Sequence, residues 1–402
     1  MRSITKTTVL AGLLFAAPAV MHAQFDFKVD GLPVQVHSFL SQGFAYSNDN
    51  NYLTMKTSQG SFAMTDFGAN VSVRITDKFR VGAQVYDRNI GQLGKWHPDL
   101  DWAYGDYKFK DWFGVRAGKV KTALGLYNDT QDTESLHTWA LLPQSLYPLD
   151  LRSNTIAHTG GDIYGTIPLR AVGSLSYTGY IGARSFDPQG GYYYFSSDLG
   201  MPISSISGRA AGGDWRWNTP VQGLMLGASF MDQTQDRKGM YTSAFLAGFS
   251  YDFVANPQRT TAAYADYSIG KWHFDGEFRR NHYIGDIATG AFPGIFAWNG
   301  SDKGWFASVS YRVNRWLELG TYNSRYYVDQ PANPADTASN HIFDQTATVR
   351  FDLTKFWDFK VEEHFINGYG DLYSAHGFYQ GSNPNGLKPK TDLLVVRTGL
   401  SF

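Results

Sequence analysis

Apolar and hydrated side chains alternate strictly in short segments that recur along most of the chain. Clear examples are residues 79–88, 271–281 and 346–353. Successive side chains of a β-strand point to opposite faces, so each segment predicts a strand with one apolar and one hydrated face. Lengths of about 9–11 residues are those of transmembrane β-strands. The pattern therefore predicts an all-β chain whose strands can meet lipid on one face and water on the other.

Seven short connections link these segments in pairs. They lie at residues 76–78, 109–111, 168–170, 218–220, 269–271, 313–315 and 354–355. The other connections are long and rich in Gly, Asn, Asp and Pro, at residues 47–60, 185–208, 285–300, 329–340 and 367–390. Aromatic residues such as Trp112, Trp272 and Trp316 flank the short turns, as in the interfacial girdle of a membrane barrel. We therefore expect the short turns on the periplasmic side and the long loops on the extracellular side.

The number of strands follows from these hairpins. Seven hairpins supply fourteen strands, and residues 34–46 and 394–402 add two more. The sequence thus predicts a transmembrane antiparallel up-and-down β-barrel of about 16 strands, an even number as closure requires. Residues 241–253 and 260–269 both resemble strands, and counting both would break the even number. We assign residues 241–253 to a long extracellular loop; a barrel of 18 strands and a secreted β-sandwich or β-helix are the alternatives.

The N-terminus has the layout of a secretory signal peptide. Arg2 and Lys6 precede an apolar run at residues 9–20, and Ala23 ends a candidate cleavage site. The run is too short for a membrane helix. We therefore expect residues 1–23 to be removed on export and residues 24–402 to form the barrel.

Composition narrows the partners of the exported chain. The chain has no Cys, so neither disulfides nor thiol chemistry are available to it. Without Arg2 and Lys6 it carries 33 basic and 36 acidic residues. This nearly neutral balance argues against nucleic acid as a partner.

The last segment alternates as the others do and ends on an aromatic residue. Leu394, Val396 and Phe402 share one face, and Arg397 lies on the other, which we expect to point to water. An aromatic terminal strand resembles the insertion signal of bacterial outer-membrane barrels. We therefore expect Phe402 to close the barrel against residues 34–46.

The longest segment without alternation spans about residues 120–157 and lies between two clear strands. It carries Asp129, Asp132, Glu134 and His137 among apolar residues. Loops of this length are usually functional or disordered, and the aromatic and Leu content argues against disorder. The loop folds either into the barrel or outward as a surface lid.

Several parts of the chain resemble Gram-negative outer-membrane porins, and especially the uncharacterised proteobacterial porin-like proteins. The similar parts are residues 36–43 with 60–68, residues 118–130, residues 141–145 and the terminal Phe402. The resemblance covers most of the mature chain. It implies an outer-membrane channel for passive diffusion of small hydrophilic solutes and ions, inserted in lipid by the outer-membrane assembly machinery and forming a homotrimer.

In porins a comparable loop narrows the lumen, so the resemblance assigns a pore constriction to residues 120–157. The loop side would consist of Asp129, Asp132, Glu134 and His137, and the candidate basic wall of Arg74, Arg80, Arg88, Arg116, Lys119 and Lys121. Acidic groups opposite basic groups create a transverse field that filters ions and orients dipolar solutes. In residues 113–121, alternation places Arg116 on one face of the strand and Lys119 and Lys121 on the other. At least one of these faces must therefore change between lipid-facing and lumen-facing near the strand end.

Catalytic motifs are missing from the sequence. It contains no Gly-x-Ser-x-Gly and no His-Glu-x-x-His, and the neighbours His37 and Ser38 point to opposite faces of a strand. We therefore expect neither enzymatic activity nor a cofactor or metal. The alternative function is an outer-membrane receptor, adhesin or sugar-binding barrel, whose long loops would use aromatic residues such as those at 192–195 and 215–217.

Overall fold

The computed structural model describes residues 25–243, 245–329, 335, 337–370 and 376–402. The expected signal peptide, residues 1–23, lies outside the described residues. Among the described residues, no helix combines the length and the apolar character that crossing a bilayer requires.

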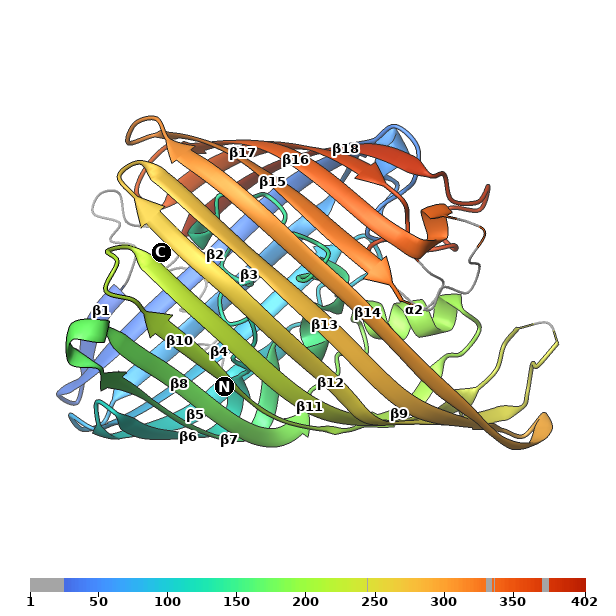
Figure 1. Cartoon of the computed structure of the whole chain (residues 1–402), viewed down its shortest axis with the longest axis horizontal. Helices are drawn as coiled ribbons and strands as arrows, with labels where there is room; N and C mark the ends of the chain where they lie inside the picture. Colours follow the sequence, from blue (N-terminus) through green and yellow to red (C-terminus); the bar gives the residue numbers. More distant parts are fainter. Residues whose placement is uncertain (1–24, 244, 330–334, 336, 371–375) are drawn as a thin grey trace, which may run out of the picture.

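Sixteen antiparallel strands form a closed barrel, as the sequence predicts (Figure 1). They are β2 (Leu32–Ser47), β3 (Ser61–Arg74), β4 (Phe79–Ile90), β5 (Asp99–Lys110), β6 (Phe113–Lys121), β7 (Ala157–Pro168), β8 (Ser174–Arg184), β10 (Arg209–Asn218), β11 (Leu224–Met240), β12 (Ser250–Ile269), β13 (Trp272–Thr289), β14 (Phe292–Arg312), β15 (Leu317–Val328), β16 (His341–Asp352), β17 (Trp357–Asn367) and β18 (Lys390–Ser401). Each strand pairs with the next in this order, and β18 pairs with β2.

Two short strands extend the ladders at the edges of this barrel. β1 (Phe25–Val29) pairs with β2, and β9 (Ile203–Ser207) pairs with β11. The helical elements are short: the 3₁₀ turns Thr57–Gln59, Glu134–Leu136, Leu149–Asn154, Arg170–Val172 and Thr337–Asn340, and the helix α2 (Gly191–Asp198).

The seam between the first and last strands of the barrel includes the C-terminal residue. The β18–β2 ladder runs from Leu393 opposite Ser47 to Ser401 opposite Phe39. Beyond it, the Phe402 amide donates to the Ser38 carbonyl at 2.7 Å, and the Ser38 amide donates to the Phe402 carbonyl at 2.9 Å. The backbone of Phe402 therefore continues the ladder that closes the barrel.

All seven predicted short turns connect consecutive strands, and they gather at one end of the barrel (Figure 1). Most of the long connections lie at the opposite end. The outer surface near the short turns is apolar, with Trp272, Phe274 and Phe278 all exposed on β13. An antiparallel barrel with an apolar outer surface has the architecture of a protein that spans a lipid bilayer.

The assignment of residues 241–253 to a loop is wrong at its C-terminal end. Residues 250–253 belong to β12, a single strand of 20 residues that also contains residues 260–269. A register shift between Ala255 and Gln258 interrupts the pairing with β13. An irregularity of this kind breaks the two-residue alternation, which is why one strand resembles two in the sequence. The total of sixteen is right because the two segments form one strand.

Residues 285–300 also differ from the prediction, because nearly all of them are paired rather than looped. β13 and β14 extend as a hairpin beyond the barrel wall, and only residues 290–291 connect them (Figure 1). The rings of Tyr283 and Trp298 stack on this extension at 4.4 Å. Cross-strand aromatic pairs of this type stabilise a ladder even where Gly and Pro are frequent.

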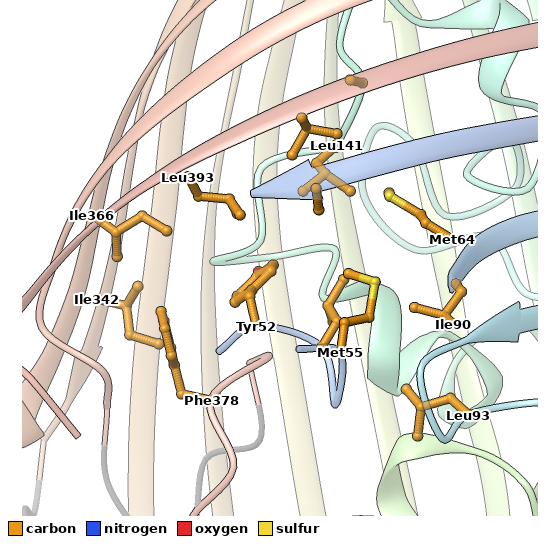
Figure 2. Close-up of a cluster of buried hydrophobic side chains, with 14 of the residues drawn as sticks. Tyr52, Met55, Met64, Ile90, Leu93, Leu141, Ile342, Ile366, Phe378 and Leu393 are labelled. Carbon is orange, nitrogen blue, oxygen red and sulfur yellow. The ribbon is translucent and has the colours of Figure 1, made fainter. Parts of the chain in front are cut away.

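Part of the barrel interior is a hydrophobic core. Tyr52 and Met55 from the β2–β3 loop pack against Leu141, Phe378 and Leu393, which come from three other parts of the chain (Figure 2). These side chains are at most 5% exposed. The inner face of the barrel is therefore filled here by apolar loop residues rather than by water.

Candidate functional site

The segment between β6 and β7, residues 122–156, crosses the interior of the barrel, and we call it the inner loop. Near its start, the Leu126 amide donates to Glu277 Oε2 on β13 at 2.9 Å. Near its end, the Arg152 guanidinium donates to both oxygens of Asp101 on β5 at 2.9 Å. Since β5 and β13 lie on nearly opposite sides of the ring of strands, these contacts place the inner loop in the lumen.

Lys360 on β17 holds the middle of the inner loop. Its side chain is fully buried, and Nζ donates to the main-chain carbonyls of Glu134 at 2.8 Å, His137 at 2.7 Å and Trp139 at 3.2 Å. Nζ also forms an ion pair with the Glu134 carboxylate. Charge-assisted hydrogen bonds are roughly twice as strong as neutral ones, so this ammonium group fixes the local path of the loop.

Arginines on the neighbouring strands bind further carbonyls of the same part of the loop. Arg350 on β16 donates to the carbonyls of Ser135, at 2.9 Å, and His137, at 2.5 Å. Arg397 on β18 donates to the Ala140 carbonyl at 2.9 Å. Arg397 thus points inward, as expected, but it contacts the inner loop and is buried.

Acidic and hydroxyl side chains hold the beginning of the inner loop on the opposite wall. Glu277 accepts a hydrogen bond from Tyr147 and forms an ion pair with Arg279 at 2.8 Å. Ser229 on β11 accepts a hydrogen bond from the Gly125 amide at 2.8 Å. On β17, beside Lys360, the Glu362 carboxylate also accepts from the amides of Ala140 and Leu141, at 3.0 and 2.8 Å. Basic wall residues therefore bind loop carbonyls, and acidic and hydroxyl groups bind loop amides.

Two of the predicted acidic loop residues are buried and paired. Asp132 Oδ1 lies 2.7 Å from Lys121 Nζ, and Asp132 Oδ2 accepts from Gln84 at 2.6 Å. Burial favours the neutral carboxyl, but Lys121 and Arg152 outweigh it and hold the pKa of Asp132 below its usual value. Burial is likewise outweighed by Lys360 and Arg397 at Glu134, whose pKa is also lowered. Both carboxylates are therefore charged groups that fasten the loop.

His137 is also buried in the inner loop. Its Nε2 atom lies 3.1 Å from the Thr130 carbonyl oxygen. Burial lowers the pKa of His137 to about 4, so the imidazole is neutral near pH 7.

A cavity of about 510 Å³ remains open beside the inner loop. Its walls come from the inner loop and from β3, β4, β5, β6, β8 and β10. Aromatic side chains, Trp102, Tyr104 and Tyr177, line part of it. On β3 and β4 the cavity is lined by Asn70 and Gln84, whereas the hydrophobic core includes Met64 and Ile90 near the ends of the same strands.

Cationic side chains that line this cavity are more exposed than most of their acidic partners, although Asp214 also lines it. The side chains of Arg116, Lys121 and Arg216 are 27%, 20% and 28% exposed. Their partners Asp162, Asp132 and Asp214 are at most 4% exposed.

Asp129 lines the cavity, whereas the other three predicted loop residues, Asp132, Glu134 and His137, do not. Its carboxylate lies 3.4 Å from Arg216 Nη2 and is 35% exposed.

The predicted basic wall is not one continuous row. Arg116 and Lys121 line the cavity, although strict alternation would separate them; Gly118, with a φ of 133°, lies between them where β6 departs from regular geometry. Arg88 and Lys119 instead line a second, smaller cavity.

The remaining wall candidates lie near the short turns. Arg80 pairs with Asp106 at 2.8 Å. Arg74 is exposed at the end of β3. The structure thus brings Asp129, Arg116 and Lys121 together at one cavity and places the other candidates elsewhere.

Four lumen residues, Lys360, Glu362, Asp214 and Arg216, are not among the site residues that the sequence predicts. Lys360 and Glu362 are two residues apart and both lie on the inner face of β17. Buried charges on a spanning strand are costly unless they have partners. Asp214 and Arg216 alternate with the exposed Trp215 on β10. A charged pair spaced by two residues on a membrane strand was the signal that could have identified them.

The sequence matches no family model and no curated protein. Solved structures do match. The anion-selective porin from Comamonas acidovorans has a TM-score of 0.55 and 12% identity, with 92% of this chain and 100% of that chain covered. The outer-membrane channel DcaP of Acinetobacter baumannii has a TM-score of 0.56 and 11% identity, over 94% and 99% of the two chains.

A third similar structure is the trimer form of OmpT, an outer-membrane protein of Vibrio cholerae. It has a TM-score of 0.50 and 9% identity, over 92% of this chain and 99% of that chain. At these identities the likeness concerns the fold alone. The chain has the fold of the outer-membrane porins.

Proposed function

We propose that this chain is an outer-membrane porin of a Gram-negative bacterium, which lets small hydrophilic solutes and ions diffuse passively across the membrane. The observation that carries the proposal is the cavity of about 510 Å³ beside the inner loop. A 16-strand barrel is wide enough for an aqueous channel, and a loop in its lumen narrows that channel. The solute path then runs between the inner loop and the wall formed by β3–β6, β8 and β10.

The charges along this path favour anions. Arg116, Lys121 and Arg216 present part of their charge to the cavity, whereas Asp132, Asp162 and Asp214 are nearly inaccessible. Charges that line a narrow passage with protein walls act strongly on passing ions. Asp129 reduces this preference because its exposed carboxylate lies on the same path.

The proposal includes three identical subunits in the outer membrane. Support comes from the apolar outer surface and from the trimer form of one structure with the same fold. Lipid would cover the outer surface, and the outer-membrane assembly machinery would recognise the terminal strand.

Conductance across a planar lipid bilayer tests the proposed function. The refolded mature chain should give discrete ohmic steps, and a salt gradient should give a reversal potential of the sign expected for an anion preference. A chain that inserts without conducting would contradict the proposal and favour a receptor or adhesin that uses the long loops.

A further inference from the structure

Three side chains of types that can ligate a metal ion meet on the lumen wall, from two neighbouring strands. They are Asp266 of β12 and His273 and Asp275 of β13, and one ligand atom from each lies within 4.8 Å of the others. His273 Nε2 lies 2.8 Å from Asp266 Oδ2 and 3.9 Å from Asp275 Oδ2. The three donors therefore surround one small volume.

The two carboxylates are directly opposite each other in the β12–β13 ladder. Like charges in this position destabilise a strand pair, so a cation between them would stabilise it. The side chains of His273 and Asp266 are 35% and 30% exposed, which lets an ion from the lumen reach them.

Asp275 is buried and held in a fixed orientation. Its Oδ2 accepts a hydrogen bond from the Tyr127 hydroxyl at 2.5 Å, and its Oδ1 accepts one from Ser308. Tyr127 belongs to the inner loop and Ser308 to β14. Carboxylates that bind metals are usually oriented by such hydrogen bonds.

We propose that Asp266, His273 and Asp275 bind a divalent transition-metal ion, with Zn²⁺ as the best match. One imidazole nitrogen and two carboxylate oxygens are a donor set that Zn²⁺ accepts, and lumen water can complete the coordination. Ca²⁺ and Mg²⁺ prefer oxygen ligands alone, and Ca²⁺ takes about six to eight of them. Sequence spacing gives no metal motif because the donors come from two strands joined by a turn.

The site connects the barrel wall to the inner loop. Asp275 would link a bound ion to the Tyr127 hydroxyl. Tyr127 directly follows Leu126, the loop residue whose amide binds Glu277. The ion would also add positive charge to the lumen wall. Its binding does not depend on whether the barrel conducts, so the two proposals fail separately.

Absorption spectroscopy with Co²⁺, which substitutes for Zn²⁺ and is coloured, tests the site. The refolded mature chain in detergent should show visible Co²⁺ bands that saturate at one ion per chain and disappear on addition of Zn²⁺. Equimolar Mg²⁺ or Ca²⁺ should leave the bands unchanged. Saturation at no fixed stoichiometry, or equal displacement by Mg²⁺, would overturn the proposal.

Two variants and one control locate the ion. His273→Ala should abolish the bands, and Asp266→Asn, which keeps the side-chain shape, should weaken binding about tenfold or more. His282→Ala is the matched control, because this histidine lies on the same strand at a position that alternation places on the other face. Unchanged binding in both Asp266→Asn and His273→Ala would show that the ion binds elsewhere and contradict the assignment.

Discussion

Lys360 shows how one side chain can determine the shape of the lumen. It is fully buried, and its ammonium group has three carbonyl partners and one carboxylate partner in the inner loop, with a second carboxylate, Asp358 of β17, at 3.7 Å. A buried charge is costly without such partners. Lys360 therefore both holds the inner loop in place and contributes to the stability of the barrel.

Replacing Lys360 with Met should destabilise the protein by roughly 3–5 kcal/mol, because Glu134 would remain buried without its partner. Unfolding of the refolded protein in guanidinium chloride measures this change. Lys303→Met is the matched control, since Lys303 is 44% exposed and its ion pair should contribute about 1 kcal/mol or less. Equal effects of the two substitutions would contradict the proposed role of Lys360.

His137 should make the stability of the protein depend on pH. Its folded-state pKa is lowered from 6.5 to about 4 by burial, so between these values the unfolded chain binds a proton that the folded chain does not. The stability associated with this group is present above pH 6.5 and is lost as the pH falls towards 4, by about 3 kcal/mol in total.

A comparison of wild type with His137→Gln isolates this contribution. The free energy of unfolding should fall more in wild type than in the variant between pH 7.5 and pH 4.5. Identical pH dependence in the two proteins would show that His137 is not buried as described.

At the scale of elements, the strands and short turns could be predicted because each carries a local pattern. Period-two alternation and turn residues identify the hairpins, as at residues 79–88 and 76–78. The prediction fails where strands remain paired although the alternation is broken. This occurs in β12, at its register shift, and in the extended β13–β14 hairpin.

The contacts of the inner loop could not be predicted in this way. Its acidic residues were identifiable, but the partners that bury Glu134 lie more than 200 residues away in sequence. Which acid remains exposed depends on these long-range contacts, and no local pattern encodes them. The sequence therefore predicted the cluster but not the separate role of Asp129.

The inner loop should respond differently to changes at its exposed and buried acids. Asp129→Lys should shift the reversal potential further towards anions and leave stability nearly unchanged, since Asp129 is 35% exposed. Asp132→Asn should instead lower stability by roughly 1–3 kcal/mol, because it weakens a buried hydrogen-bonded pair. Bilayer recordings and guanidinium unfolding together measure both effects. A larger selectivity shift for Asp132→Asn than for Asp129→Lys would contradict the assigned positions.

At the scale of the whole molecule, the barrel closes where its last strand, β18, pairs with its first, β2. Deleting Phe402 removes two backbone hydrogen bonds to Ser38 and a ring pair with Phe356 at 6.0 Å. We expect a smaller fraction of folded barrel in the outer membrane, measured by heat-modifiable migration on gels. Phe402→Tyr keeps both the backbone and the aromatic ring, and should restore assembly. Normal assembly after the deletion would contradict a role for this residue in closure.

The lumen as a whole is asymmetric. Loops and apolar side chains cover the inner faces of β15–β18 and β2 and reach Met64 of β3 and Ile90 of β4 at the ends of these strands, while the cavity lies farther along β3–β6, β8 and β10. The alternation of each strand indicates which face is inner, but it does not show which inner positions the loops cover. Leu393 and Val395 of β18 face the lumen and are nevertheless fully buried.

Cysteine modification during bilayer recording tests the path through this asymmetric lumen most directly, because the chain contains no Cys of its own. Ser176→Cys places a thiol on the wall of the cavity, and Ser324→Cys places one on the filled side, where Ser324 is 1% exposed. A water-soluble thiol reagent should reduce the conductance of Ser176→Cys and leave that of Ser324→Cys unchanged. Block of Ser324→Cys without block of Ser176→Cys would contradict the proposed path.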